Sequence, residues 1–249
     1  VGPLARTVED AEALYSVMAG HDPNDPWSVP RTAGETLSGR VTGLAIGVPQ
    51  PWVEGAPLTG ETAAVFADTL DRLADLGAAV REVRRLALQG DSPLTDLLDA
   101  EVASVHRAWL EDPARDYGPE VAQRMTQALT VTLDRYVAAQ TQRSALRNAA
   151  AEAFLGVDLL VTPTTGAIRK RLGEPAIPGN GRTYPYRQVL SCLTWPVNHI
   201  GGPALAVPLR GTGRPPYSLQ LIGPRWQERR LLAVGRALEE VGIVGFDPP

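Results

Sequence analysis

Serines are the first residues of this sequence to consider as nucleophiles, because a serine hydroxyl attacks amide and ester carbonyls once a neighbouring base activates it. None lies in a Gly-x-Ser-x-Gly turn, the local pattern that exposes the nucleophile of many hydrolases. Most fall on expected helix faces or at helix caps, where a hydroxyl group has a structural explanation. They are Ser16, Ser28, Ser38, Ser92, Ser104, Ser144, Ser191 and Ser218. We therefore assign none of them a catalytic role.

Cys192 is an alternative nucleophile, which an imidazole such as that of His199 would have to activate. A lone cysteine in an apolar segment such as Ser191-Cys192-Leu193 is more typical of a small buried side chain. The histidines, His21, His106 and His199, share no metal-ligand spacing, and no glycine-rich phosphate loop is present. The residues thus predict no metal site, no cofactor and no assembled catalytic constellation.

The elements that must position any such side chains alternate between amphipathic helices and short apolar strands. Helical periodicity occurs over residues 8–18, 61–76 and 228–241, from Ser92-Pro93 towards Trp109, and over 119–154 with a break near 130–132. Apolar runs typical of buried strands occur over residues 44–48, 79–83, 157–161, 204–209 and 218–222, whereas 173–186 has the character of a loop. This alternation predicts an α/β fold with a mixed β-sheet flanked by helices. No repeat or linker divides residues 1–249, so one structural unit is expected.

Composition narrows the classes of function. The chain has 249 residues and a formal charge of −4, without the basic stripe expected of a nucleic-acid surface. No apolar run approaches the roughly 20 residues of a membrane span. The single cysteine fits a reducing compartment, so a cytoplasmic location is expected. Val1 precedes a well-formed helix start without an initiator methionine, which suggests that a longer protein extends upstream.

Three segments carry a resemblance to a known family. They are VGPLARTVEDAEALYSVMAGHDPNDPWS at residues 1–28, VDLLVTPTT at 157–165, and NHIGGPALAVPLRGTGRPPYSLQLIGPRWQERRLLAVGRALE at 198–239. In this order and at this spacing they resemble the C-terminal half of the amidase-signature hydrolases. The resemblance covers essentially the whole chain, and it implies the C-terminal portion of the amidase-signature fold.

The resemblance also implies a mechanism that this chain lacks. Family members hydrolyse carboxamides through a serine nucleophile, a bridging serine in a cis peptide and a lysine that starts the proton relay. Those residues lie upstream of the segment matched by Val1 to Ser28, and this sequence has no Gly-Gly-Ser-Ser-Gly-Gly run and only one lysine, Lys170. We expect no catalytic residue in this chain, which alone should be inactive.

Part of a substrate pocket is expected to remain, because the C-terminal half of the family covers the catalytic centre. The candidate pocket residues are Thr162, Thr164, Thr165, Tyr184, Trp195 and Asn198. Asn198 also has a structural interpretation, because it would satisfy backbone groups of the following turn. The same holds for Gly201 and Gly202, which would allow close backbone approach, and for Gln220, which would hydrogen-bond a neighbouring loop.

Three hypotheses follow. The chain is half of an amidase that acts on a small-molecule amide once an N-terminal half completes it, part of the A subunit of a tRNA-dependent amidotransferase, or a non-catalytic binding or scaffold protein. The middle helical region favours the first. Because the family sheet draws strands from both halves, we also expect exposed apolar edges and hence self-association, or an N-terminal partner. Neither a nucleic-acid nor a membrane partner is expected.

Overall fold

A computed structural model of the chain describes residues 2–30, 40–84, 86, 94–112, 117–213 and 215–246. The chain forms two compact units, one made of residues 1–87 with 151–249 and the other of residues 88–150. This division does not test the prediction of one structural unit over residues 1–249, which stays a prediction.

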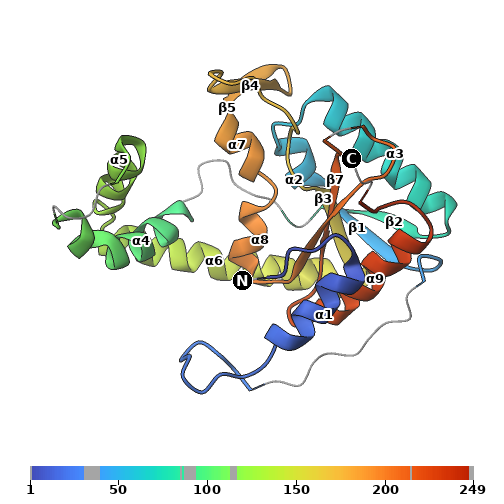
Figure 1. The fold of residues 1–249 in the computed structure, drawn as a ribbon, viewed down its shortest axis with the longest axis horizontal. Helices are drawn as coiled ribbons and strands as arrows, with labels where there is room; N and C mark the ends of the chain where they lie inside the picture. Colours follow the sequence, from blue (N-terminus) through green and yellow to red (C-terminus); the bar gives the residue numbers. More distant parts are fainter. Residues whose placement is uncertain are drawn as a thin grey trace. The chain divides into compact units, whose positions relative to one another are not determined.

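The first unit is built on a five-stranded sheet (Figure 1), which confirms the predicted α/β fold with a mixed sheet. β1 pairs in parallel with both β2 and β3, whereas β7 pairs antiparallel with β3 and with β6. The order across the sheet is β2-β1-β3-β7-β6. The strands are β1 (Ala45–Pro49), β2 (Ala79–Val83), β3 (Leu159–Pro163), β6 (Ala204–Pro208) and β7 (Ser218–Ile222).

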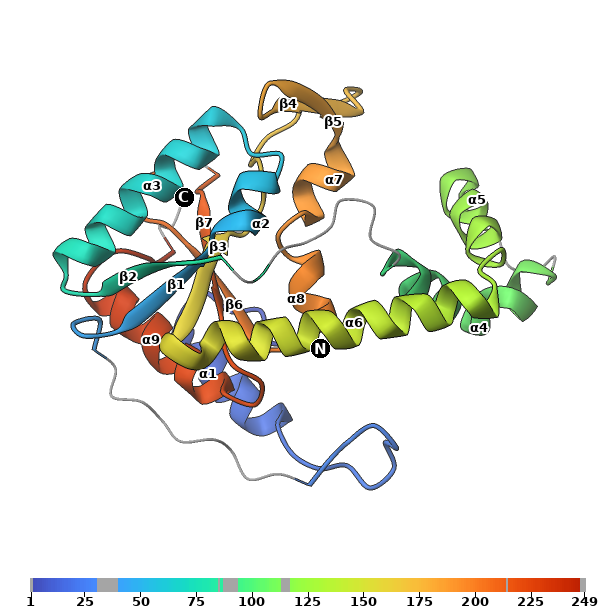
Figure 2. The same ribbon diagram turned by 180° about the vertical axis from the view of Figure 1, so that it is seen from behind.

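One face of this sheet lies under α3 (Gly60–Asp75) and α9 (Glu228–Glu240), and α1 (Val8–Met18) packs against α9 (Figures 1 and 2). Alternate strand residues project into this core, where they meet apolar residues of the three helices. The strand residues are Ile46, Val48, Leu159, Val161, Val207, Leu219 and Leu221. Burial of this face is the main driving force for assembling the unit.

Local signals explain where the helices begin. The hydroxyl of Thr7 accepts a hydrogen bond from the Asp10 N–H at 3.1 Å and caps α1. Thr59 caps α3 in the same way through the Thr62 N–H at 3.2 Å. Gly77 ends the α3 region with a φ of 87°, a conformation that glycine adopts without strain. Of the helices described, none is long and apolar enough to cross a membrane.

The stretch predicted as loop over residues 173–186 instead contains a hairpin, in which β4 (Ala176–Gly179) pairs antiparallel with β5 (Arg182–Pro185). Its prolines hid the strand pattern, since proline is unfavourable within a ladder. Two short helices, α7 (Tyr186–Ser191) and α8 (Trp195–Ile200), lie between this hairpin and β6. The short helix α2 (Gln50–Gly55) follows β1, and the 3₁₀ helix η1 (Phe154–Gly156) precedes β3.

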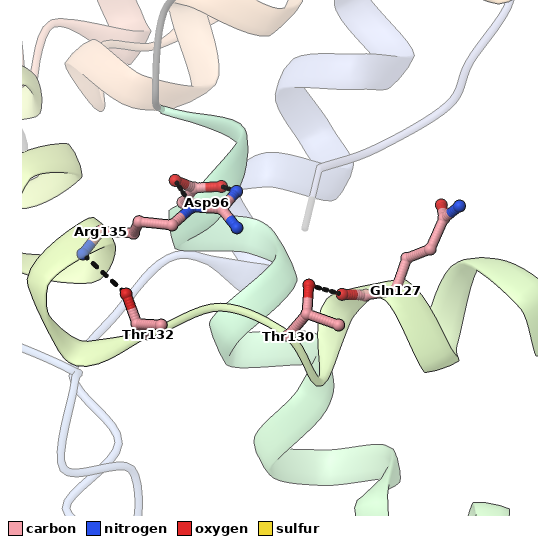
Figure 3. Close-up of polar contacts among 5 residues, drawn as sticks. All are labelled: Asp96, Gln127, Thr130, Thr132 and Arg135. Carbon is pink, nitrogen blue, oxygen red and sulfur yellow. Dashed lines mark hydrogen bonds and ion pairs between the residues drawn. The ribbon is translucent and has the colours of Figure 1, made fainter.

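The second unit is helical. It contains α4 (Thr95–Leu110), α5 (Pro119–Ala128) and most of α6 (Leu133–Ala153), so the predicted break near 130–132 is confirmed. The expected start of α4 at Ser92-Pro93 lies outside the described residues. Arg135 of α6 binds the buried carboxylate of Asp96 on α4 (Figure 3). The Nε–Oδ2 and Nη2–Oδ1 distances are 3.0 and 2.5 Å. The turn between α5 and α6 is closed by two further bonds, from the Thr130 hydroxyl to the Gln127 carbonyl and from the Arg135 N–H to the Thr132 hydroxyl.

Candidate functional site

The carboxyl ends of β1 and β3 meet at one edge of the sheet because the two strands are parallel. α2 follows β1 directly and places Trp52 there, while Thr164 follows β3. Trp52 is only 2% exposed, yet its indole N–H has no hydrogen-bond acceptor among the described residues, and the same holds for the buried Thr164 hydroxyl. Buried polar groups without partners are costly, so these two groups mark the edge as the candidate site.

Behind this edge lies a buried polar contact centred on Gln220 of β7. Its side-chain amide donates to the Thr162 hydroxyl at 2.9 Å and to the Leu193 carbonyl at 3.1 Å. The predicted hydrogen bond from Gln220 to a neighbouring loop is thereby confirmed, since Leu193 lies between α7 and α8. Thr162 is completely buried, and its hydroxyl accepts the hydrogen bond from Gln220. In this structure Thr162 therefore supports the neighbouring segment.

The hairpin packs beside the same edge. Thr165 is half-buried and its hydroxyl donates to the Ala167 carbonyl at 2.9 Å, which turns the chain away from β3. Tyr184 on β5 packs on a small apolar cluster of Ala167, Ile177 and Val189. A Cβ added at Gly166 would lie 2.6 Å from the Pro57 carbonyl oxygen, so glycine is required where the segment after α2 crosses the loop after β3.

Trp195 and Asn198, the other predicted pocket residues, both lie on α8 but in different surroundings. The half-buried Trp195 ring stacks edge-on against His199, with ring centroids 4.6 Å apart. Asn198 is exposed, and the described residues give its side-chain amide no hydrogen bond. The interpretation that Asn198 satisfies the following turn is therefore wrong: Gly201, with a φ of 67°, ends α8 by donating to the Val197 carbonyl.

Cys192 is an unreactive thiol in this structure. Its Sγ donates to the Val189 carbonyl at 3.3 Å, and burial, the largest effect, raises the pKa of the thiol to about 11. The thiolate is the nucleophilic form, so almost none is present at neutral pH. The preference for Cys192 as a packing residue agrees with this geometry.

The helical serines are likewise occupied by their own helices. The hydroxyls of Ser16, Ser104, Ser144 and Ser191 donate to carbonyls three or four residues earlier, at 2.7 to 3.1 Å. Lys170 is exposed and its ammonium group lies 5.0 Å above the centre of the Tyr186 ring. In the described part of the chain, no cluster of three or more His, Cys, Asp or Glu side chains could hold a metal ion.

The family model described as "Amidase" matches residues 1–232. The chain belongs to the amidase signature family. Both the resemblance and the fold class inferred from the sequence are thereby confirmed.

The chain spans between 52 and 60% of the length of the following proteins that it matches. It is 30% identical to the glutamyl-tRNA(Gln) amidotransferase A subunit of Methanospirillum hungatei JF-1, over 96% of this chain and 60% of that protein. A solved structure described as an amidase superposes with a TM-score of 0.82 at 30% identity, covering 96% of this chain and 52% of the other. The glutamyl-tRNA(Gln) amidotransferase A subunit of Thermotoga maritima, at 24% identity, shows the same fold with a TM-score of 0.69 over 96% of this chain and 52% of that one.

Within this family fold, the structure brings together only some of the predicted pocket residues. Thr162, Thr164 and Thr165 share one segment at the end of β3, and Gln220 connects that segment to the turn before α8. Trp52 was not predicted, although its signal is present in the sequence. Trp52 comes soon after Pro49, which ends a strand, in the sequence Pro49-Gln50-Pro51-Trp52. A residue in this position lies at the carboxyl end of a parallel strand, where α/β proteins commonly bind ligands.

Proposed function

We propose that this chain supplies the substrate-covering half of an amidase, which hydrolyses a small-molecule carboxamide only when an N-terminal segment with the serine pair and lysine completes it. The observation that carries the proposal is the family match over residues 1–232 in a chain that spans about half the length of its relatives. The occupied serine hydroxyls and the protonated Cys192 thiol support inactivity of the chain alone.

The binding part of the proposal rests on the edge formed by β1 and β3. The Trp52 N–H is a hydrogen-bond donor without an acceptor among the described residues, and the Thr164 hydroxyl can donate or accept. An amide substrate offers one carbonyl acceptor and one N–H donor, so these two groups match its polar atoms. We propose Thr164, Thr165 and Trp52 as pocket residues, with Tyr184, Trp195 and Asn198 as more distant candidates and Thr162 as support.

The open side of the sheet supports the need for a partner segment. β6 is one of the two edge strands of the described sheet, the other being β2, and its residues Ala204 and Ala206 are exposed. Beside its start lies an open hollow of about 360 Å³, lined by Pro3, Tyr15, Gly202, Glu228 and Leu231 among others. The Pro208 carbonyl at the end of this edge already accepts a hydrogen bond from the Gly245 N–H, which leaves the edge at Ala204 and Ala206 for another chain segment to pair with. We therefore propose an N-terminal half as the partner, with self-association when it is absent.

The proposal is tested by measuring ammonia release from a panel of simple carboxamides. We expect no release above background from the purified chain alone, and release when it is refolded together with the N-terminal half of an amidase-signature relative. Replacing the signature serine of that half by alanine is the control, because it should abolish the recovered activity. Ammonia release by the chain alone, lost in a Cys192→Ala or serine variant, would overturn the proposal.

A second candidate function is that of an amidotransferase A subunit, which the names of the curated relatives favour. The closer superposition on the amidase than on the Thermotoga maritima protein supports the first proposal instead. Transfer of ammonia to a misacylated tRNA by the completed protein would decide for the second. We further propose a cytoplasmic protein without a nucleic-acid or membrane partner, on the grounds of its single cysteine and its acidic charge.

A further inference from the structure

The helix α2, which carries Trp52, is too short to be stable by itself. It has six residues, and Pro49 before it provides no side-chain cap. Forming a single helical turn is unfavourable, and the carbonyl groups of the last turn have no partner inside the helix. The place of the Trp52 indole at the candidate site therefore depends on contacts that other segments make with α2.

The turn of the β4–β5 hairpin makes such a contact (Figures 1 and 2). The side-chain amide of Asn180 donates to the Ala56 carbonyl at 2.6 Å and to the Glu54 carbonyl at 3.3 Å. The backbone N–H of Asn180 donates to the Leu58 carbonyl at 3.1 Å. Ala56 and Leu58 are both 4% exposed, and buried carbonyl groups need such partners. One residue of the hairpin thus binds three carbonyl groups at the end of α2 and directly after it.

Two glycines, Gly179 and Gly166, let the hairpin and the loop after β3 lie directly against Pro57. A Cβ added at Gly179 would lie 2.7 Å from the Pro57 carbonyl oxygen, and one added at Gly166 would lie 2.6 Å from it. The Gly166 carbonyl also accepts a hydrogen bond from the Thr59 N–H at 2.9 Å. Thr164, whose hydroxyl has no partner among the described residues, comes shortly before Gly166. The stretch after α2 therefore contacts both the hairpin and the loop that carries Thr164.

We propose that Asn180 is a positioning residue of the candidate site, which holds α2 so that the Trp52 indole N–H stays where it would bind the substrate amide. The inference rests on the proposed function, in which Trp52 donates to a polar atom of that amide. Asn180 needs no contact with the substrate, because it acts through α2. With φ values of 45° and 72°, Asn180 and Gly181 also form the hairpin turn, so asparagine has both a backbone role and a side-chain role.

Substitutions separate these two roles of Asn180. Glycine adopts a positive φ without strain, so Asn180→Gly keeps the turn and removes the amide that binds α2. Asn180→Asp keeps the size of the side chain and its tolerance of a positive φ, but a carboxylate cannot donate to the Ala56 carbonyl. Thr183→Ala is the matched control, because Thr183 is exposed on the same hairpin and lies opposite Pro178 in the ladder.

Hydrogen exchange of the Trp52 indole N–H, followed by NMR of the full chain, tests the positioning without an assay of activity. Trp52→Phe identifies its resonance. We expect Asn180→Gly and Asn180→Asp to speed this exchange at least about tenfold, because a loosened α2 admits water to a side chain that is 2% exposed. The indoles of Trp195 and Trp226 in the same unit should change less than about twofold, and Thr183→Ala should leave all three unchanged. Unchanged exchange at Trp52, or equal acceleration of all three indoles, would overturn the proposal.

Kinetic measurements on the completed protein, refolded with the N-terminal half of a relative, test the role in substrate binding. Asn180→Gly should raise KM for a simple carboxamide at least about fivefold while kcat changes less than about twofold, as for loss of a binding contact. In a Trp52→Phe background the same substitution should change KM less than about twofold, since Asn180 acts through Trp52. Equal effects in both backgrounds would overturn the proposal. If the completed protein released no ammonia, the proposed function would fail, and the exchange measurement would still decide whether Asn180 positions Trp52.

Discussion

Gln220 shows how a single buried amide can connect three separate segments. Its side chain is 3% exposed and bonds both the Thr162 hydroxyl and the Leu193 carbonyl. Replacement by leucine keeps the volume but leaves both partners without a donor. We expect Gln220→Leu to lower the free energy of unfolding by ~1–3 kcal/mol, the cost of unpaired buried groups. Urea unfolding measures it.

The matched control for that substitution is Gln188→Leu on α7, because Gln188 is exposed in the same unit. Its effect should stay within about 0.5 kcal/mol, as for other surface changes. Thr162→Val should cost less than Gln220→Leu, since the Leu193 carbonyl keeps its donor. If Gln188→Leu destabilised the protein as much as Gln220→Leu, the buried contact would not be the cause.

The buried Cys192 thiol predicts a pH dependence. Its pKa is raised from 9.0 to about 11, chiefly by burial. Between these values the unfolded chain has lost the thiol proton while the folded chain still binds it, so stability falls as pH rises from about 9 to about 11. Comparing urea midpoints of the natural chain and Cys192→Ala over this range isolates the effect: the natural chain should lose more stability. Parallel pH curves for the two proteins would contradict the burial of this thiol.

At the scale of elements, the strands that consist of a short apolar run were predicted close to their observed positions. β2 and β7 have the predicted bounds: Gly77 shortly precedes β2, and Gly223 directly follows β7. The hairpin of β4 and β5 was missed because Pro178 and Pro185 interrupt it. Its signal was the dipeptide Asn180-Gly181, whose φ values of 45° and 72° suit a two-residue hairpin turn.

The pocket residues show the limit of prediction from one sequence. The Thr162 to Thr165 segment was found because a buried strand runs directly into it, and this pattern is local. Trp52 escaped notice because its importance comes from parallel pairing of β1 with β3, whose paired residues are 113 positions apart, as in Ile46 and Leu159. Only the fold shows that the two segments end at one edge.

The helical unit offers a prediction about an element. Asp96→Asn removes the carboxylate that binds Arg135 in two places, while the remaining amide can accept only one such bond. We expect amide hydrogen exchange to speed up by at least about tenfold in α4 and at the start of α6, with little change in β1 or β3. The exposed Asp134→Asn is the control. Uniform loss of protection in both units would show that they unfold together.

At the scale of the whole molecule, the direction of the β6 backbone decides what the sheet can accept. The Leu209 N–H donates to Tyr217 at 2.8 Å, and the Gly223 N–H donates to Pro203 at 2.9 Å. Odd-numbered residues of this strand therefore point their backbone groups towards β7. Because backbone direction alternates along a strand, Ala204 and Ala206 present their N–H and C=O groups to the open edge.

Because of this alternation, Ala206→Pro tests whether a strand of the N-terminal half pairs with the edge of β6, without disturbing the pairing of β6 with β7. Proline at Ala206 removes an outward N–H and no bond to β7, so the chain alone should keep its fold, as circular dichroism and its unfolding midpoint would show. Pairing of an added strand needs that N–H, so the ammonia release recovered with the N-terminal half should fall at least about tenfold. Ala206→Val, which keeps the N–H, should retain most of it. If Ala206→Pro supported full activity, the completing segment would have to join the protein elsewhere than at β6.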